Sequence, residues 1–376
     1  WVFLPFGVIA LAMIMTMFPS VPKKEKEPVD FLGSVFISLV IVPVLLAFSW
    51  AGSKYPWVSP EILGLFVAAI LALIIFVFVE NRAINPVLPL NLFNNSIFSL
   101  SSLANFILGI GMFGTMMYMP MFVQGVIGAS PTISGFIVMP MTLSLVTASA
   151  LSGQIISKTG RYKNIAILGL SIMAGGLVSL ALMNMNTSNT TATINMIIVG
   201  TGLGMTFPVF TLTIQNAVGQ ELLGVATGSA QLFRQLGGTM GVSVMGLIMN
   251  IRMNSKLAVL LPQIEGTAGL SPELADKLTV LKNPQILMNH EKLAEFARNL
   301  PPQAQPYFSE FILKLKEALG FGLSGVFLAG AVVIVMAIVL TFFLQEIPLR
   351  TTLAEKTDDE PIPQEKDIEG SLEPLK

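Results

Sequence analysis

The sequence predicts an all-α polytopic membrane protein, and three observations support this fold class. Hydrophobic residues make up 53% of the 376 residues and charged residues only 11%, whereas an average soluble domain carries about 25% charged residues. The mean hydropathy is +0.75. The apolar residues are gathered in runs of about 17–25, the length of a helix that crosses a ~30 Å hydrocarbon core.

About nine apolar runs meet this length criterion. In chain order they cover Trp1–Phe18, Phe31–Trp50, Ile62–Val79, Ile97–Val123, Ile133–Ile156, Asn164–Met183, Thr193–Ile214, Val225–Met249 and Phe321–Leu344. The first run opens inside an apolar helix, with no cap, no start methionine and no basic segment of a signal peptide. We therefore expect the natural chain to extend before Trp1.

Positive charges in the short loops predict the orientation of the spans. If every run crosses the membrane, one side carries most of these cations, namely Lys23, Lys24, Lys26, Arg82, Lys158, Arg161 and Lys163. The opposite short loops hold only Lys54. The cation-rich side is expected to be the cytoplasm, and the C-terminus then lies there too.

The polar segment 251–320 is expected to be an extracellular loop with helices of its own. Ser271-Pro272-Glu273 is typical of a helix start, with a capping serine followed by proline. Apolar residues at helical spacing from Phe308 to Leu319 predict an amphipathic helix that enters the last span and lies on the membrane surface or packs on the bundle. A lid or simple connector is favoured over a gate. The acidic tail 346–376 is expected to be disordered.

Several kinds of chemistry are excluded by composition. The chain has no cysteine and a single histidine, His290, so disulfides, thiolate metal sites, histidine metal clusters and a serine triad are not expected. The spans hold no paired carboxylates, which argues against a membrane-embedded enzyme. The net charge of -1 gives no indication of nucleic-acid binding.

One deeply placed charge indicates a transporter. Arg234 lies in the segment Gln231–Gly241 inside a long apolar run, where an arginine costs about 2.5–3.5 kcal/mol and should face a cavity or a partner helix. Gly237 and Gly241 are four residues apart, which allows another helix to approach closely. The alternative is a helix-packing arginine bonded to backbone carbonyls.

Several separated segments carry a family resemblance. They are Trp1–Gly7, Phe78–Arg82 with Pro86 and Pro89, Tyr118–Pro120 with Gln124 and Ser130-Pro131, Gly200–Gly204 with Pro208, the arginine segment and Glu346–Arg350. Together they resemble the C-terminal two-thirds of a drug:proton antiporter of the major facilitator superfamily, in the fourteen-span branch typified by QacA and EmrB. Leu4 departs from this pattern, because asparagine is usual there.

The loop Gly153–Lys163 is similar to a cytoplasmic loop of that superfamily. Ser157 and Lys158 stand where the fuller pattern has aspartate and arginine, so the charge relay attributed to this loop is in doubt. Gly153 is expected to allow close helix contact and Gly160 a tight turn. Arg161 and Lys163 would then meet helix C-terminal carbonyls or acids, although a plain positive-inside anchor explains the same cations.

The resemblance implies a major facilitator fold that lacks the N-terminal half of its core. It assigns 1–18 to the last helix of that half, 19–96 to two accessory helices, 97–250 to the first five helices of the C-terminal half, 251–320 to the external loop, 321–345 to the last helix and 346–376 to the tail. The C-terminal half should contain inverted three-helix repeats around a midplane cavity.

Polarizable, aromatic and amide side chains are the candidates for the substrate pathway, since such surfaces suit flat lipophilic molecules. They are Arg234, Gln231, Gln124, Tyr118, Met117, Phe136, Met205, Phe207, Gln215 and Asn216. Any one of them could instead fill the core or face lipid. The candidates for conformational motion are Gly153, Gly160, Arg161, Lys163, Gly200, Gly204, Pro208, Gly237 and Gly241.

The resemblance implies export of lipophilic, often cationic drugs in exchange for protons by alternating access, in a bacterial inner membrane. The proton gradient would drive it without a cofactor or metal, and a monomer would suffice once the N-terminal half is present. No Asp or Glu lies deep in a span from Ile97 onward, so the coupling acid is expected in the missing half. A same-fold transporter of a metabolite or anion and a truncated, non-transporting fragment remain alternatives.

Overall fold

The computed structural model describes residues 4–17, 30–52, 54–260, 287–289, 293, 296–298 and 305–346, whose regular structure is helical. The chain divides into two compact units, Trp1–Asn94 and Asn95–Lys376. The positions of the two units relative to one another are not determined, so each is described by itself.

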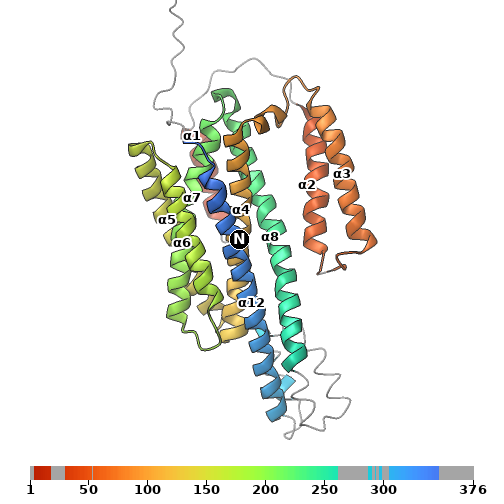
Figure 1. The fold of residues 1–376 in the computed structure, drawn as a ribbon, viewed down its shortest axis with the longest axis vertical. Coiled ribbons are helices and arrows are strands. Elements are labelled where there is room, and N and C mark those ends of the chain that lie inside the picture. Colours follow the sequence, from red (N-terminus) through yellow and green to blue (C-terminus); the bar gives the residue numbers. More distant parts are fainter. Residues whose placement is uncertain are drawn as a thin grey trace, which may run out of the picture. The chain divides into compact units, whose positions relative to one another are not determined.

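The first unit holds α1 (Leu4–Met17), α2 (Phe31–Trp50), α3 (Pro60–Glu80) and the short η1 (Leu90–Asn94). The helices α2 and α3 pack side by side as a hairpin (Figure 1). Its helix starts are set locally, because the Asp30 side chain accepts a hydrogen bond from Gly33 N (2.8 Å) and Ser59 caps α3 with Pro60 at the first helical position.

The second unit holds the remaining helices. They are α4 (Ser96–Met121), the π-helical η2 (Phe122–Ile127), α5 (Pro131–Thr159), α6 (Lys163–Ala181), α7 (Asn189–Asn216), η3 (Gln220–Leu222), α8 (Leu223–Leu260) and α12 (Gln305–Phe342). Asn95, Ser130 and Ser188 cap α4, α5 and α7 through their side-chain oxygens. Gly160 ends α5 in the left-handed conformation (φ 69°), which glycine adopts without steric cost.

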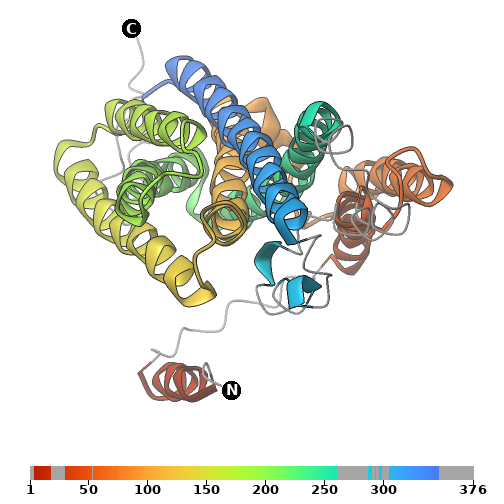
Figure 2. The same cartoon turned by 90° about the horizontal axis from the view of Figure 1, so that it is seen from below.

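Four of the packed helix pairs of the second unit follow an approximate two-fold relation, whereas the pair α8 and α12 has no packed counterpart in α5 and α6. The helices α5 and α7 pack closely, as do α4 and α8, α6 and α7, and α12 and α4 (Figure 2). Exchanging α4 with α7, α5 with α8 and α6 with α12 maps these pairs onto one another. Because successive spans alternate in direction, helices related in this way run antiparallel, as in an inverted three-helix repeat.

Eight helices among the described residues are long and apolar enough to cross a membrane, and α1 is a shorter apolar helix. Each of the predicted apolar runs therefore contains a helix, and the predicted all-α polytopic class is confirmed. The described part of α1 has 14 residues, and the ends of its predicted span lie outside the described residues.

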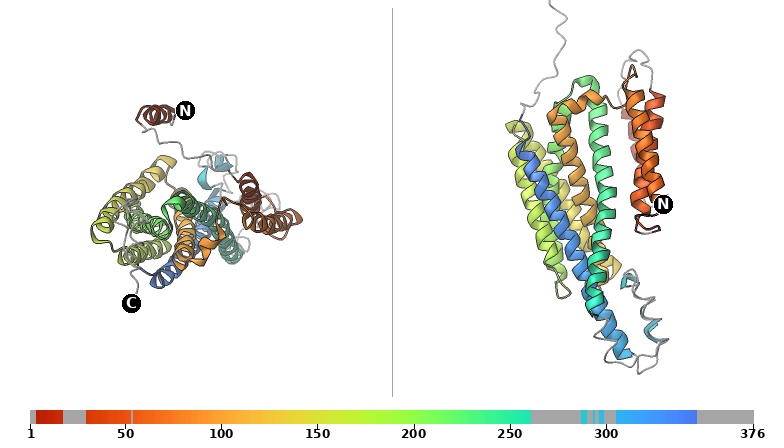
Figure 3. Two further views of the ribbon diagram at one scale, coloured as in Figure 1. Left: turned by 90° about the horizontal axis from the view of Figure 1, so that it is seen from above. Right: turned by 45° about the vertical axis from the view of Figure 1, so that its right-hand side comes forward.

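The last two helices are longer than the predicted spans. Helix α8 continues past Met249 to Leu260, and α12 begins at Gln305, well before Phe321. The two extensions lie together at one end of the bundle (Figure 3), where Leu257 and Leu315 belong to one buried cluster. A salt bridge of 3.1 Å between Lys256 Nζ and Glu317 Oε1 also joins them.

The amphipathic helix predicted from Phe308 to Leu319 is therefore present, as the continuous first part of α12. Its apolar residues Phe308, Phe311, Leu315 and Leu319 are buried within the protein. The expected loop is shorter than 251–320 in consequence. The predicted helix start at Ser271 and the tail from 347 onward lie outside the described residues.

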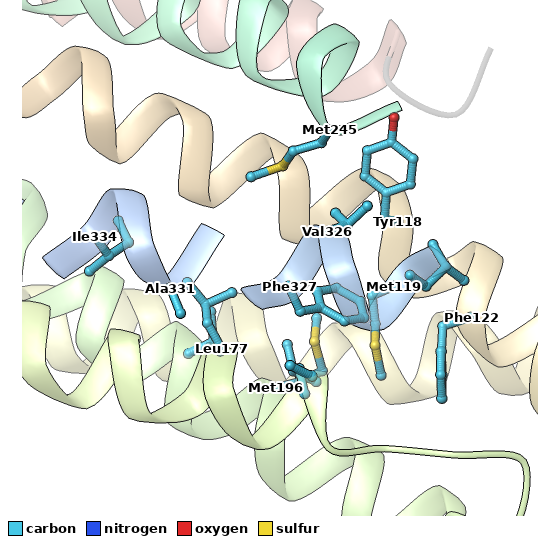
Figure 4. Packing of buried hydrophobic residues seen from close by; sticks show 14 of the residues in the cluster. Tyr118, Met119, Phe122, Leu177, Met196, Met245, Val326, Phe327, Ala331 and Ile334 are labelled. Carbon is cyan, nitrogen blue, oxygen red and sulfur yellow. The ribbon is translucent and has the colours of Figure 1, made fainter. Parts of the chain in front are cut away.

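The core of the second unit is built from all six of its long helices, α4, α5, α6, α7, α8 and α12. Figure 4 shows Met245, Tyr118, Met119, Leu177 and Phe327 converging there. The rings of Phe122 and Phe327 meet edge to face, with centroids 6.4 Å apart. This packing holds the helices that carry the candidate site.

Candidate functional site

Arg234 lies on α8 and is held by two side chains. Its guanidinium carbon lies 4.2 Å from the centroid of the Phe207 ring on α7, and its Nη2 donates a hydrogen bond to Gln231 Oε1 one turn earlier. The residue is only 9% exposed. Among the described residues its polar partner is thus the side-chain amide of Gln231. A helix-packing arginine, the alternative stated above, would instead bond to backbone carbonyls.

A glycine face brings α8 against α4 immediately beside this arginine. A Cβ at Gly237 would overlap the carbonyl oxygen of Phe106, and one at Gly241 would lie 2.8 Å from Ile110 Cα. On the facing helix, a Cβ at Gly109 would overlap the carbonyl oxygen of Arg234. The close approach that the spacing of Gly237 and Gly241 predicts therefore occurs, and it places the backbone that carries Arg234 directly against α4.

Four polar or aromatic candidates form a strip along α7 and α8. Gln215 Nε2 donates to Thr227 Oγ1 at 2.9 Å, which ties the end of α7 to the start of α8. Thr227 and Gln231 are four residues apart on α8, on one exposed side of the helix. Gln231 accepts from Arg234, which stacks on Phe207, so these three side chains are in contact, and Gln215 lies along the same two helices through its bond to Thr227. We call these four residues the α7–α8 strip.

Two other candidates on α4 and η2 differ in their surroundings. The Tyr118 hydroxyl donates to Val242 O of α8 at 2.7 Å, and Tyr118 is 7% exposed. It thus joins two helices in the core. Gln124 is half-buried in the π-helical turn Phe122–Ile127, an irregularity that often accompanies a functional site.

Four further candidates lie elsewhere on the helices. Met117 is 62% exposed and Phe136 67% exposed, so both present apolar surface outside the protein core. Met205 is half-buried on α7, and its Cβ would lie 2.8 Å from a Cβ at Gly169 of α6. Asn216 is the last residue of α7. The described structure places none of the four against Arg234.

Glycines also bring α7 against α5. A Cβ at Gly200 would overlap the carbonyl oxygen of Met141, and one at Gly204 would overlap that of Leu145. Pro208 follows one turn later inside α7, where it removes a backbone hydrogen bond. Under the two-fold relation, this contact corresponds to the one between α4 and α8.

The loop between α5 and α6 is bound to the end of α12. Lys163 Nζ donates to Phe342 O at 2.8 Å, so this lysine meets the carbonyl end of a helix, as expected. The backbone N–H groups of Tyr162 and Lys163 donate to Glu346 Oε1 at 2.9 and 3.4 Å. The Tyr162 hydroxyl donates to Gln345 O at 3.2 Å. We call this set of contacts the α5–α6 clasp.

The other residues of that loop behave differently. Arg161 is exposed, and Gly160 makes the expected tight turn. A Cβ at Gly153 would meet no atom within 4 Å, so the expected close helix contact is absent in this structure. Sequence reasoning missed the roles of Tyr162 and Glu346. The only signal was the position of Glu346 at the start of a resembling motif.

The described residues contain no group of three or more His, Asp or Glu side chains that could hold a metal ion. Arg234 is the charged residue of the strip, and its neighbours are amides, a hydroxyl and a ring. The arrangement can bind a solute by stacking, by hydrogen bonds and by charge.

Comparisons with known proteins identify the family. Residues 1–242 match the Major Facilitator Superfamily, and the chain belongs to this superfamily. It is 35% identical over 363 residues to "Multidrug transporter protein MdtP" of Bacillus subtilis, covering 94% of this chain and 66% of that protein. It is 31% identical over 341 residues to "Tetracycline resistance determinant" of Streptomyces rimosus, covering 87% of this chain and 94% of that protein.

Other matches are more distant. Two uncharacterised major facilitator transporters of Mycobacterium tuberculosis are 29% identical, and the chain spans 48% of their length. The chain thus covers about half to two thirds of these relatives and of MdtP. A solved bacterial homologue of the lysosomal transporter Spinster has 14% identity and a TM-score of 0.48, covering 83% of this chain and 64% of its own, a likeness too weak to support an argument.

Proposed function

We propose that this chain is part of a secondary active transporter that exports lipophilic, often cationic drugs in exchange for protons. The α7–α8 strip is the observation that carries the proposal. An arginine inside a spanning helix costs free energy, so it is expected to face a transport pathway and not lipid. Arg234 stacks on Phe207, and the neighbouring Gln231 lies on the exposed side of α8. The named functions of MdtP and of the tetracycline determinant support drug export.

Alternating access is proposed as the transport cycle. The glycine contacts of α4 with α8 and of α5 with α7 let packed helices shift with little side-chain rearrangement. The inverted relation between the two three-helix groups is the architecture that such rocking uses. We assign the chain to the fourteen-span branch, with α2 and α3 as its accessory pair, and propose that a further core half completes the pathway.

Proton coupling needs a titratable group, and Arg234 cannot supply it because a guanidinium keeps its proton. We propose that Arg234 favours the ionised form of a carboxyl across the pathway, since an opposite charge at close range stabilises a carboxylate. A movement that separates Arg234 from this carboxyl would remove that stabilisation, so the carboxyl would take up a proton, and the return of Arg234 would favour its release.

The first test is ethidium efflux from bacterial cells that express the gene with its natural upstream coding sequence. Efflux above the empty vector that collapses on adding a protonophore is the expected result. In everted vesicles, ethidium should also dissipate a preformed pH gradient, because each exported molecule would be exchanged for a proton. Efflux that persists with the protonophore would contradict proton antiport.

Two arginine variants on α8 then test the strip. Arg234→Ala should reduce efflux strongly at unchanged expression. Arg252→Ala is the matched control, because Arg252 also stacks on a ring, Phe321 at 4.3 Å, near the far end of the same helix. Arg252→Ala should keep efflux. If Arg234→Ala keeps it as well, the strip has no role in transport, and absence of efflux in the natural protein would favour a metabolite or anion transporter or a non-transporting fragment.

A further inference from the structure

Glu80 is a buried carboxylate at the end of α3. It is 3% exposed, and its Oε1 accepts a hydrogen bond of 2.5 Å from Leu88 N. Its other oxygen, Oε2, is buried and has no hydrogen-bond partner among the described residues. A buried carboxylate oxygen without a partner costs free energy, so this atom requires an explanation.

Asp30 presents the same pattern at the start of α2. Its Oδ1 caps the helix by accepting from Gly33 N at 2.8 Å, whereas its Oδ2 is buried and has no partner among the described residues. Each of the two carboxyl groups therefore has one oxygen bound to the backbone and one oxygen that lacks a donor.

The two unpartnered oxygens face the same place. A Cβ at Gly33 would lie 2.7 Å from Glu80 Oε2 and would overlap Asp30 Oδ2, so both atoms border the space left by this glycine. Two ionised carboxylates that share such a site repel each other, and the charged form of one is disfavoured. A hydrogen held in this space would give each of the two oxygens a polar partner.

The two cations that the structure describes in this unit, Arg82 and Lys54, are occupied elsewhere. Arg82 stacks on the Phe78 ring at 4.0 Å, and Lys54 lies over Trp50 at 4.7 Å, near the opposite end of the hairpin. Neither forms a salt bridge with Asp30 or Glu80 in the described structure. A metal ion fits less well than a proton, because Mg²⁺ and Ca²⁺ take six or more oxygen ligands and this space offers two unoccupied carboxylate oxygens.

We propose that Asp30 and Glu80 form a proton-binding site, in which one hydrogen is shared between Asp30 Oδ2 and Glu80 Oε2. The ligand is a proton, and with it bound the pair carries a single negative charge. The bound proton joins the first turn of α2 to the last turn of α3 and, through Leu88 N, to the segment that follows. This site is independent of the α7–α8 strip and does not depend on the proposed transport activity.

Infrared spectroscopy of the purified full chain in lipid nanodiscs tests the proposal. A protonated carboxyl gives a C=O stretching band that shifts in deuterium oxide. We expect this band near neutral pH in the unmodified protein and its loss as the pH is raised. The measurement on the unmodified protein is decisive by itself, because absence of the band at neutral pH would contradict the proposal.

Three variants assign the band. Asp30→Asn and Glu80→Gln should each abolish it, since each leaves one carboxylate next to an amide that can donate to it. Glu61→Gln removes an exposed carboxylate in the first turn of α3 and should leave the band unchanged. A band that survives both of the first two changes belongs to another group and overturns the proposal. Loss of the band on adding magnesium chloride at constant pH would show a cation site instead and also overturns it.

Discussion

The stacking of Arg234 on Phe207 is the contact on which the candidate site depends. A guanidinium over an aromatic face contributes about 0.5–2 kcal/mol, more where water is excluded. A double-mutant cycle with Arg234→Gln and Phe207→Leu should therefore give a coupling free energy of about 0.5–2 kcal/mol for unfolding in detergent. The control cycle uses Phe210→Leu in place of Phe207→Leu, because Phe210 is a buried ring of α7 and the ring on which Arg234 stacks is Phe207. Equal coupling in the two cycles would contradict a specific contact.

The hydrogen bond of the Tyr118 hydroxyl leads to a second prediction for a single residue, namely that its loss destabilises the protein. Tyr118→Phe removes the bond of 2.7 Å to Val242 O and leaves that carbonyl without this donor inside the bundle. We expect a loss of about 0.6–1.7 kcal/mol in unfolding free energy, the range measured for hydrogen bonds between membrane helices. Tyr55→Phe is the matched control, because the Tyr55 hydroxyl makes no hydrogen bond to a described residue. The bond is dispensable if the two variants unfold alike.

Residue types alone locate the site only in part. Arg234 could be found from the sequence because a charge in an apolar helix is costly wherever it lies. Its partner Phe207 could not be singled out, since 25 phenylalanines occur in the chain and helix spacing does not tell which of them faces α8. Tyr118 illustrates the same limit, because its hydroxyl reaches across to Val242 only through the approach of α4 to α8.

At the scale of helices, the contact between α4 and α8 predicts that α8 requires glycine at position 237 but tolerates alanine at position 228. Gly237→Ala places a Cβ against the Phe106 carbonyl oxygen, so α4 and α8 must separate. We expect a loss of about 1–3 kcal/mol in unfolding free energy, as for other overpacked contacts. Gly228→Ala, on the same helix, meets nothing within 4 Å and should be neutral or stabilising by up to about 1 kcal/mol. Equal effects of the two changes would show that helix propensity alone decides.

The α5–α6 clasp makes a second prediction at this scale. Glu346 Oε1 accepts from the N–H groups of Tyr162 and Lys163 at the start of α6, which is the position where a carboxylate stabilises a helix. Glu346→Ala should remove about 0.5–2 kcal/mol of this capping and accelerate hydrogen exchange of those two amides. Glu221→Ala, in the exposed η3, should leave their exchange unchanged. Unchanged exchange in Glu346→Ala would show that the clasp does not protect these amides.

The helices themselves were predictable, whereas two of their lengths were not. Runs of apolar residues and capping residues such as Asn95, Ser130 and Ser188 mark helix positions directly in the sequence. The apolar-run criterion does not find the extensions of α8 and α12, because charged residues lower the hydropathy of these segments. Leu257 and Leu315 on the two extensions are both buried in the main cluster, and Lys256 forms a salt bridge with Glu317, so the extensions are stabilised by segments that are far apart in the chain.

For the whole molecule, the inverted relation of the two three-helix groups requires that each helix cross once and that successive loops lie on opposite sides. The cations predict that the loop between α5 and α6 lies in the cytoplasm. The loop between α6 and α7 would then lie outside. The orientation of every helix in the second unit depends on this assignment, and so does the direction of proposed transport.

Single cysteines test this orientation directly, since the sequence contains none of its own. Lys158→Cys lies at the exposed end of α5, and Asn186→Cys lies in the exposed turn between α6 and α7. In intact cells a membrane-impermeant maleimide should label Asn186→Cys and spare Lys158→Cys, whereas both should react after permeabilisation. The unmodified chain is the control for background labelling. Labelling of Lys158→Cys alone in intact cells would invert the topology, and labelling of both would exclude a single crossing by α6.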